Sequence, residues 1–324
     1  MSSSAAPEQH SRLAVALAVV GAVLCGGLVA TQSRINGQLG RELGDGTLAA
    51  LISFGSGFLI MIVVALVIPG ARRGVVTVVS SIRSGSIPWW YAAGGAAGGL
   101  FVLSQGLTAA ILGVALFTVA TIAGQTLSGL LVDRRGLGTM APKPVTASRI
   151  VGAVLAVLAV ALAVSPQVRG GVEWWVLVLP LAAGLGLGWQ QAVNGQVREH
   201  SGSALTATFF NFMVGALLLA VVFAVHALLA WQPVTFPVDP LLYVGGINGI
   251  LFVAGYAIVV RFTGVLLLGL GAIAGQLAAS LVFDLVLPVA GHPVAWTTIA
   301  GTAVTFIAIG IASLPPARRG AVPA

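Results

Sequence analysis

The stretch Thr31-Gln-Ser-Arg-Ile-Asn-Gly-Gln-Leu-Gly40 decides the fold, because the chain contains it a second time as Trp189-Gln-Gln-Ala-Val-Asn-Gly-Gln-Val197. In both copies an apolar segment leads into Gln-x-x-x-Asn-Gly-Gln, and a short polar loop leads into a second apolar segment. The match continues into that second segment, where Phe54 recurs as Phe212 and Ser53 lies opposite Asn211. Such a repeat has to be recognised first, because it determines the architecture.

The composition indicates a membrane protein. Of the 324 residues, 58% are hydrophobic and only 7% are charged, with a mean hydropathy of +1.06, whereas an average soluble domain carries roughly 25% charged residues. Several runs of about 20 uncharged residues predict a polytopic helical membrane protein. The net charge of +7 indicates basic cytoplasmic loops, since no basic stripe or aromatic-interleaved module suggests a nucleic-acid partner.

Ten transmembrane helices are predicted between a polar, disordered cytoplasmic tail (1–11) and a cytoplasmic tail (315–324). We expect them near residues 13–30, 47–68, 88–108, 111–132, 150–164, 174–197, 204–229, 241–260, 265–287 and 294–314. A basic loop that contains Arg72, Arg73 and Arg83 is expected after the second helix.

The distribution of Lys and Arg predicts the orientation of these helices. With the N-terminus inside, only Arg34, Arg41 and Arg169 of the 15 basic residues fall on the outer side. Both termini are therefore expected in the cytoplasm.

The repeat extends over both halves of the chain. Ile122-Ala-Gly-Gln125 recurs as Ile273-Ala-Gly-Gln276, and the chain divides into two five-helix repeats, 12–166 and 167–314. Because five is odd, the two repeats cross the membrane in opposite directions, an arrangement common in secondary transporters. The predicted fold class is an all-α membrane protein with ten transmembrane helices in two inverted five-helix repeats.

Ten helices in two inverted halves, with the Gln-x-x-x-Asn-Gly-Gln and Ile-Ala-Gly-Gln blocks, resemble the drug/metabolite transporter (DMT) superfamily. Within it the chain is similar to the bacterial YdcZ-type family, as a fused two-repeat form, over about residues 13–314. The resemblance implies a small-solute carrier or exporter of the bacterial cytoplasmic (inner) membrane and specifies no substrate.

Amide side chains are the candidate substrate ligands, because no Asp or Glu lies in the middle of a predicted helix, where a charge is costly. Gln125 and Gln276 lie near the middle of two matched helices. An amide both donates and accepts hydrogen bonds, so this pair would hold a neutral or zwitterionic solute. The alternative is a structural hydrogen bond between helices.

Gln32, Gln190, Asn36, Asn194 and Trp189 complete the candidate substrate-binding set. Asn-Gly suits left-handed geometry, so Asn36 and Asn194 either terminate helices or form matched gates at the two faces. Gln32 and Gln190 lie one turn earlier and point the same way. Trp189 is either an interfacial anchor or a cavity wall.

Two matched carboxylates, Asp133 and Asp284, end predicted helices at opposite faces. Each is expected either to pair with a neighbouring cation or, if it faces a water-filled cavity, to couple protons to transport.

The predicted function is a secondary transporter that carries a small polar or amphipathic metabolite or drug by alternating access. A channel and a non-transporting membrane scaffold stay open as alternatives, although no ring of charge or carbonyl filter typical of channels is visible. No phosphate loop, redox motif or metal cluster occurs, so no enzyme activity, cofactor or metal site is expected. The expected partners are the lipid bilayer and a small-molecule substrate, with a homodimer left open.

Overall fold

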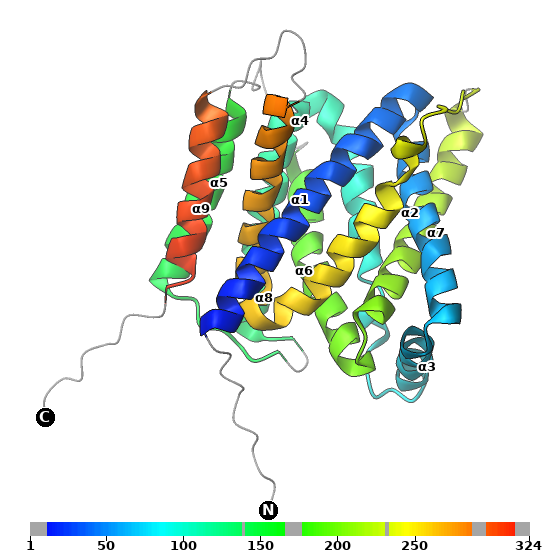
Figure 1. Cartoon of the computed structure of the whole chain (residues 1–324), viewed down its shortest axis with the longest axis horizontal. Coiled ribbons are helices and arrows are strands. Elements are labelled where there is room, and N and C mark those ends of the chain that lie inside the picture. The colour runs from blue at the N-terminus through cyan, green and yellow to red at the C-terminus, as the bar shows by residue number, and fades with distance from the viewer. Residues whose placement is uncertain (1–11, 138–139, 166–176, 231–232, 287–295, 315–324) are drawn as a thin grey trace, which may run out of the picture.

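The computed structural model describes residues 12–137, 140–165, 177–230, 233–286 and 296–314, and in these ranges the chain is helical with no β-strand (Figure 1). The helices are α1 (Arg12–Leu43), α2 (Gly46–Val67), α3 (Pro69–Arg83), α4 (Gly95–Arg135), α5 (Ala147–Val164), α6 (Val178–Ser201), α7 (Ala204–Ala230), α8 (Gly245–Val286) and α9 (Trp296–Ala312). Short 3-10 turns precede α4 and α8, at Trp89–Tyr91 (η1) and Pro240–Tyr243 (η4). The prediction of an all-α protein is confirmed for the described part of the chain.

The Asn-Gly pairs do not end helices. Asn36 lies inside α1 and Asn194 inside α6, and both helices continue to glycines with a left-handed backbone, Gly44 and Gly202, each at φ 69°. The interpretation of Asn36 and Asn194 as helix terminators is therefore wrong. A positive φ is needed in the turn into the next helix. In both halves the residue in that turn is a glycine, which has no Cβ and adopts this backbone conformation without strain.

The segment expected to be a basic loop is the helix α3. Ile68 has an extended backbone that breaks the chain away from α2, and Pro69 occupies the first turn, where its missing N–H costs nothing. The side of α3 with Ala71, Gly74 and Val78 is buried, whereas its three arginines are exposed. Tertiary burial of one apolar stripe explains the helix, which the charges alone did not reveal.

The long helices α4 and α8 each cover two of the predicted spans. α8 is broken at Gly264, where φ is 76° and ψ is 176°, at the expected boundary between 241–260 and 265–287. α4 is helical from Gly95 to Arg135 and so includes the expected boundary near 109. Four described segments are long and apolar enough to cross a membrane, namely α1, α2, α7 and Pro240–Phe283.

The helices of one half pack mainly on helices of the other half. The principal contacts join α1 to α8, α4 to α6, α2 to α7, and α5 to α9, and Figure 1 shows these helices side by side in one bundle. Two matched glycines allow close approaches between these helices: Gly26 of α1 lies against the carbonyl of Ala272, and Gly184 of α6 against that of Thr121. A side chain at either glycine would separate the helices.

One end of the bundle carries both the start of α1 and the end of α9 (Figure 1). The same end carries α3, which is seen nearly along its own axis and therefore crosses the direction of α2 and α7. With the predicted orientation, this is the cytoplasmic end.

Candidate substrate-binding site

Two phenylalanines at matched positions meet where α2 and α7 cross. The rings of Phe54 on α2 and Phe212 on α7 lie with centroids 5.4 Å apart at an interplanar angle of 39°. Each ring occupies space left free by a glycine of the opposite helix, Phe212 at Gly57 and Phe54 at Gly215. Polar side chains from both halves lie around this phenylalanine pair.

A cluster of three buried amides lies in the second half, and we call it the α6–α7 amide cluster. Asn211 Oδ1 accepts hydrogen bonds from Gln190 Nε2 at 2.8 Å and from Asn194 Nδ2 at 3.1 Å. All three side chains are buried. Gln190 Oε1 and Asn211 Nδ2 make no hydrogen bond to any described group. The cluster therefore keeps one free acceptor and one free donor.

The matched positions in the first half form the α1–α2 polar cluster of Gln32, Asn36 and Ser53. Here serine takes the place of Asn211, so no shared amide acceptor exists, and Gln32 Nε2 donates to the backbone oxygen of Gly245 at 2.8 Å. Asn36 Oδ1 and Ser53 Oγ are buried and have no hydrogen-bond partner among the described residues. Both halves thus retain buried polar atoms with unused hydrogen-bonding capacity.

A glycine lies next to both a polar cluster and one ring of the phenylalanine pair in each half. A Cβ added at Gly249 would lie 2.6 Å from Gln32 Nε2 and 2.7 Å from Phe212 Cζ. A Cβ added at Gly98 would lie 3.4 Å from both Gln190 Oε1 and Phe54 Cζ. Free amide groups beside aromatic rings suit a solute with both polar and apolar parts.

The remaining sequence-predicted residues lie outside these contacts. Gln125 is buried on α4, and a Cβ at Gly269 of α8 would be 3.5 Å from its Nε2 atom. Gln276 is half-buried on α8. Among the described residues no hydrogen bond joins Gln125 or Gln276 to the other or to either polar cluster. The structure thus groups Gln32 with Asn36 and Gln190 with Asn194.

Trp189 packs within a hydrophobic cluster. Its ring stacks on Trp90 with centroids 6.4 Å apart at 30°, and Val78 of α3 and Val193 of α6 belong to the same cluster. Trp189 therefore helps to fix α3 and η1 against α6.

Sequence reasoning did not include Ser53, Phe54, Asn211 and Phe212 in the site. A signal was available, because these residues occupy matched positions in the two halves. The sequence does not show that α2 and α7 cross beside α1 and α6, and this crossing brings the four residues into the site.

Asp133 is held in a separate, buried ionic network. Its carboxylate accepts hydrogen bonds from the backbone N–H groups of Val265 at 2.7 Å and Leu266 at 3.2 Å, and it forms an ion pair with Arg149. Asp133 thus caps the helical segment that restarts after the break at Gly264. The expectation that a neighbouring cation pairs with Asp133 is confirmed, and the side chain of Asp284 lies outside the described residues.

Lys143, in the connection between α4 and α5, completes this network. Its Nζ atom donates to the backbone oxygen of Phe262 at 3.3 Å, and its backbone N–H donates to the Asp133 backbone oxygen at 2.6 Å. Burial lowers the pKa of Lys143 below its ordinary value; Asp133 opposes this effect and Arg149 adds to it. The network ties the α4–α5 connection to the break in α8.

A family model described as "Putative inner membrane exporter, YdcZ" matches residues 17–162 and 175–312. No curated protein sequence matches the chain. A crystal structure of another protein has a similar fold, with a TM-score of 0.64 over 94% of this chain and 97% of that one. The two sequences are 15% identical, so this similarity establishes the fold alone.

Proposed function

The chain belongs to the YdcZ family of membrane exporters, whose model covers each half in turn, and on that premise we propose a secondary transporter that works by alternating access. The cargo is a small polar or amphipathic metabolite or drug that leaves the cell across the inner membrane. The two halves form inverted repeats of five spans each, with α4 and α8 supplying two spans apiece. Such repeats place the substrate site where they meet, near the middle of the membrane.

The main support for this proposal is that both polar clusters beside the phenylalanine pair contain buried polar atoms without a hydrogen-bond partner among the described residues, including the matched pair Ser53 and Asn211. A buried polar group without a partner costs about 1–3 kcal/mol. We attribute such a cost in both clusters to a ligand that supplies the missing hydrogen bonds. The α1–α2 polar cluster and the α6–α7 amide cluster would hold the solute, with the two rings against its apolar part.

A difference between matched helix segments supports the alternating mechanism. Four residues of α1 are exposed, whereas their four counterparts on α6 are buried: Ser33, Arg34, Gly37 and Gln38 against Gln191, Ala192, Gly195 and Gln196. Gly195 packs against Val260 of α8, whereas the nearest group to a Cβ at Gly37 is its own neighbour Arg41, at 3.7 Å. In this conformation the α6 segment is buried and its α1 counterpart is exposed. In the second state of the transport cycle, the α1 segment would be buried and the α6 segment exposed.

Gln125 and Gln276 either contact the solute or join helices in this scheme. They lie on α4 and α8, which pack on α6 and α1, respectively. If solute contacts them, they extend the site along these helices. If they only join helices, substitution leaves solute binding unchanged.

Ligand-dependent thermal stabilisation of the detergent-purified protein tests the function and the site together. Small metabolites and cationic drugs are screened, since a ligand that binds the folded state raises apparent stability. Stabilising compounds are then tested for movement into or out of proteoliposomes.

We expect the stabilisation to be lost in Gln190→Ala and Gln32→Ala and retained in Gln38→Ala. Gln38 is the matched control, because it is an exposed amide of α1 whose Nε2 atom donates to Glu42 of the same helix at 2.9 Å. If the stabilisation were lost only in Gln125→Ala and Gln276→Ala, the substrate-binding site would lie at that pair instead. Stabilising compounds that are never transported would contradict the function.

A further inference from the structure

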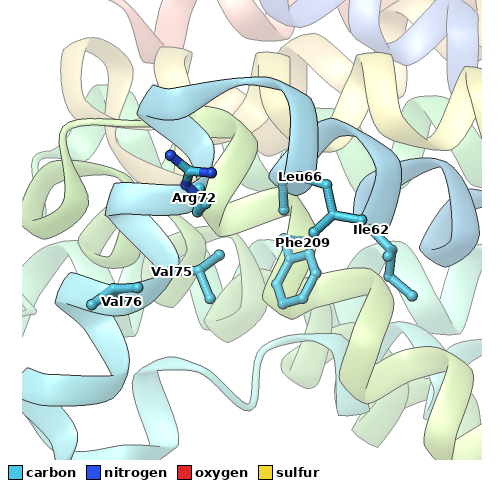
Figure 2. A pocket seen from close by; sticks show the side chains of 7 residues that line it. Ile62, Leu66, Arg72, Val75, Val76 and Phe209 are labelled. Atoms are coloured by element: carbon cyan, nitrogen blue, oxygen red, sulfur yellow. The ribbon is translucent and has the colours of Figure 1, made fainter.

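An apolar groove opens on the flank of the bundle beside α3. It has a volume of about 230 Å³ and lies between α2, α3 and α7. Figure 2 shows Ile62 and Leu66 of α2, Val75 and Val76 of α3, and Phe209 of α7 around it, with Arg72 beside them. Arg72 is the one charged residue of this lining, so the groove combines a long apolar wall with a single cation.

With the predicted orientation, α3 and this groove lie at the cytoplasmic end of the bundle (Figure 1), where we place the lipid headgroups. The buried stripe of α3 packs against the cytoplasmic ends of α6 and α7, where Thr206 Oγ1 donates to the Ala71 backbone oxygen at 3.3 Å. Leu66 is 67% exposed and Val76 is 63% exposed. Exposed apolar side chains beside exposed arginines are typical of a helix that lies in the membrane interface.

The charge around the groove is positive and unbalanced. The three helices that line it, α2, α3 and α7, contain no Asp or Glu. Arg73 is directed to the start of its own helix, where its Nε atom donates to the Pro69 backbone oxygen at 3.3 Å. Arg72 has no ion pair among the described residues. A guanidinium group at the mouth of an apolar groove suits a phosphate attached to an alkyl chain.

We propose that this groove binds an anionic phospholipid of the cytoplasmic leaflet. Arg72 holds the phosphate, and an acyl chain lies along Leu66, Val76 and Phe209. The lipid thereby fastens α3 to α2 and α7. Because Val78 of α3 shares a hydrophobic cluster with Val193 and Val197 of α6, the bound lipid also supports the packed segment of α6 that carries Asn194.

Lipid binding to delipidated protein in detergent tests the proposal, with phosphatidylglycerol and phosphatidylcholine as the probes. We expect phosphatidylglycerol to bind with 1:1 stoichiometry, as measured by native mass spectrometry, and more tightly than phosphatidylcholine. Arg72→Gln weakens this binding about tenfold, since a hydrogen bond to a charged group is lost. Arg83→Gln is the matched control: it removes the same charge from an exposed site at the far end of α3 and leaves affinity within about twofold of wild type.

A second variant tests the apolar wall without changing charge. Ala65 lines the groove, so Ala65→Phe fills it and is expected to reduce phosphatidylglycerol binding. If Ala65→Phe does not fold, Val76→Ala removes exposed apolar wall from α3 and is expected to reduce the same binding.

Three results would overturn the proposal. Equal binding of both lipids would remove the role of the anionic headgroup. Equal losses in Arg72→Gln and Arg83→Gln would indicate a diffuse attraction to positive charge. Displacement of phosphatidylglycerol by millimolar glycerol phosphate would identify a site for free phosphate rather than for a lipid.

Discussion

Phe54 and Phe212 occupy matched positions in the two halves of the chain and touch each other, with ring centroids 5.4 Å apart. Each ring also lies over a glycine of the opposite helix, Gly215 for Phe54 and Gly57 for Phe212. Gly249 borders both Gln32 and Phe212, and Gly98 borders both Gln190 and Phe54, so each polar cluster lies near one ring of the pair. Any movement of one half relative to the other must therefore change the packing of these two rings and of the amides beside them.

A methyl group at Gly57 is expected to disturb this packing. Gly57→Ala places a Cβ into the ring of Phe212, and overpacking of this kind typically costs about 1–3 kcal/mol. Gly55→Ala is the control on the same helix, because nothing lies within 4 Å of a Cβ there. Thermal unfolding in detergent should show a lower midpoint for Gly57→Ala than for Gly55→Ala. Equal midpoints would mean that the rings move aside at little cost.

Loss of the shared acceptor is expected to destabilise the α6–α7 amide cluster. Asn211→Ala leaves two buried donors, Gln190 Nε2 and Asn194 Nδ2, without their acceptor, at a cost of about 1–3 kcal/mol. Ser53→Ala at the matched position should change stability little, because the Ser53 hydroxyl has no partner. Unfolding of both variants in detergent measures the difference, and a larger effect for Ser53→Ala would contradict the described hydrogen bonding.

The ion pair of Asp133 and Arg149 is expected to show strong coupling. Asp133→Asn leaves a buried guanidinium without its counter-charge, and breaking a buried pair in this way costs about 3–5 kcal/mol. The double variant Asp133→Asn/Arg149→Met should lose less stability than the sum of the two single variants. A double-mutant cycle by thermal unfolding measures this coupling. Additive losses would show that the pair contributes no interaction energy.

Lys143 is expected to make stability rise with pH in the alkaline range. Its pKa in the folded protein is lowered from 10.5, chiefly by burial, so the unfolded chain holds the proton more tightly. Between the lowered pKa and 10.5 the unfolded state carries more protons, and the free energy of unfolding therefore increases with pH. Stability measured against pH should rise less steeply in that window for Lys143→Met than for the wild type. Parallel curves would exclude the proton on Lys143 as the cause.

Cysteine labelling is expected to distinguish the two matched helix segments. In a Cys25→Ser background, which removes the chain's single cysteine, Gln38→Cys should react with an impermeant maleimide added outside the cell. Gln196→Cys should react slowly and only from the cytoplasmic side, because Gln196 is buried, and faster when a transported compound is present. Labelling of both variants from the same side would contradict the inverted topology, and an unchanged rate at Gln196→Cys would argue against alternation.

Much of the architecture could be predicted from the sequence, because the signals involved are local. Apolar runs, proline and glycine boundaries and the internal repeat identified a membrane protein, most helix positions and the YdcZ family, which the family model confirms. The break at Gly264 falls between the two spans predicted at 241–260 and 265–287. The matched polar positions Gln32 and Gln190 were also visible, because a repeat preserves spacing along the chain.

Only the tertiary structure decided which of these residues act together. Asn211 became the shared acceptor because α7 crosses α6, and Asp133 caps Val265 because α4 ends beside the break in α8. The helix α3 and the inclusion of Asn36 within α1 likewise followed from packing rather than from composition. Spacing along a helix determines which face a residue occupies, but contacts between residues on different helices depend on how those faces are packed.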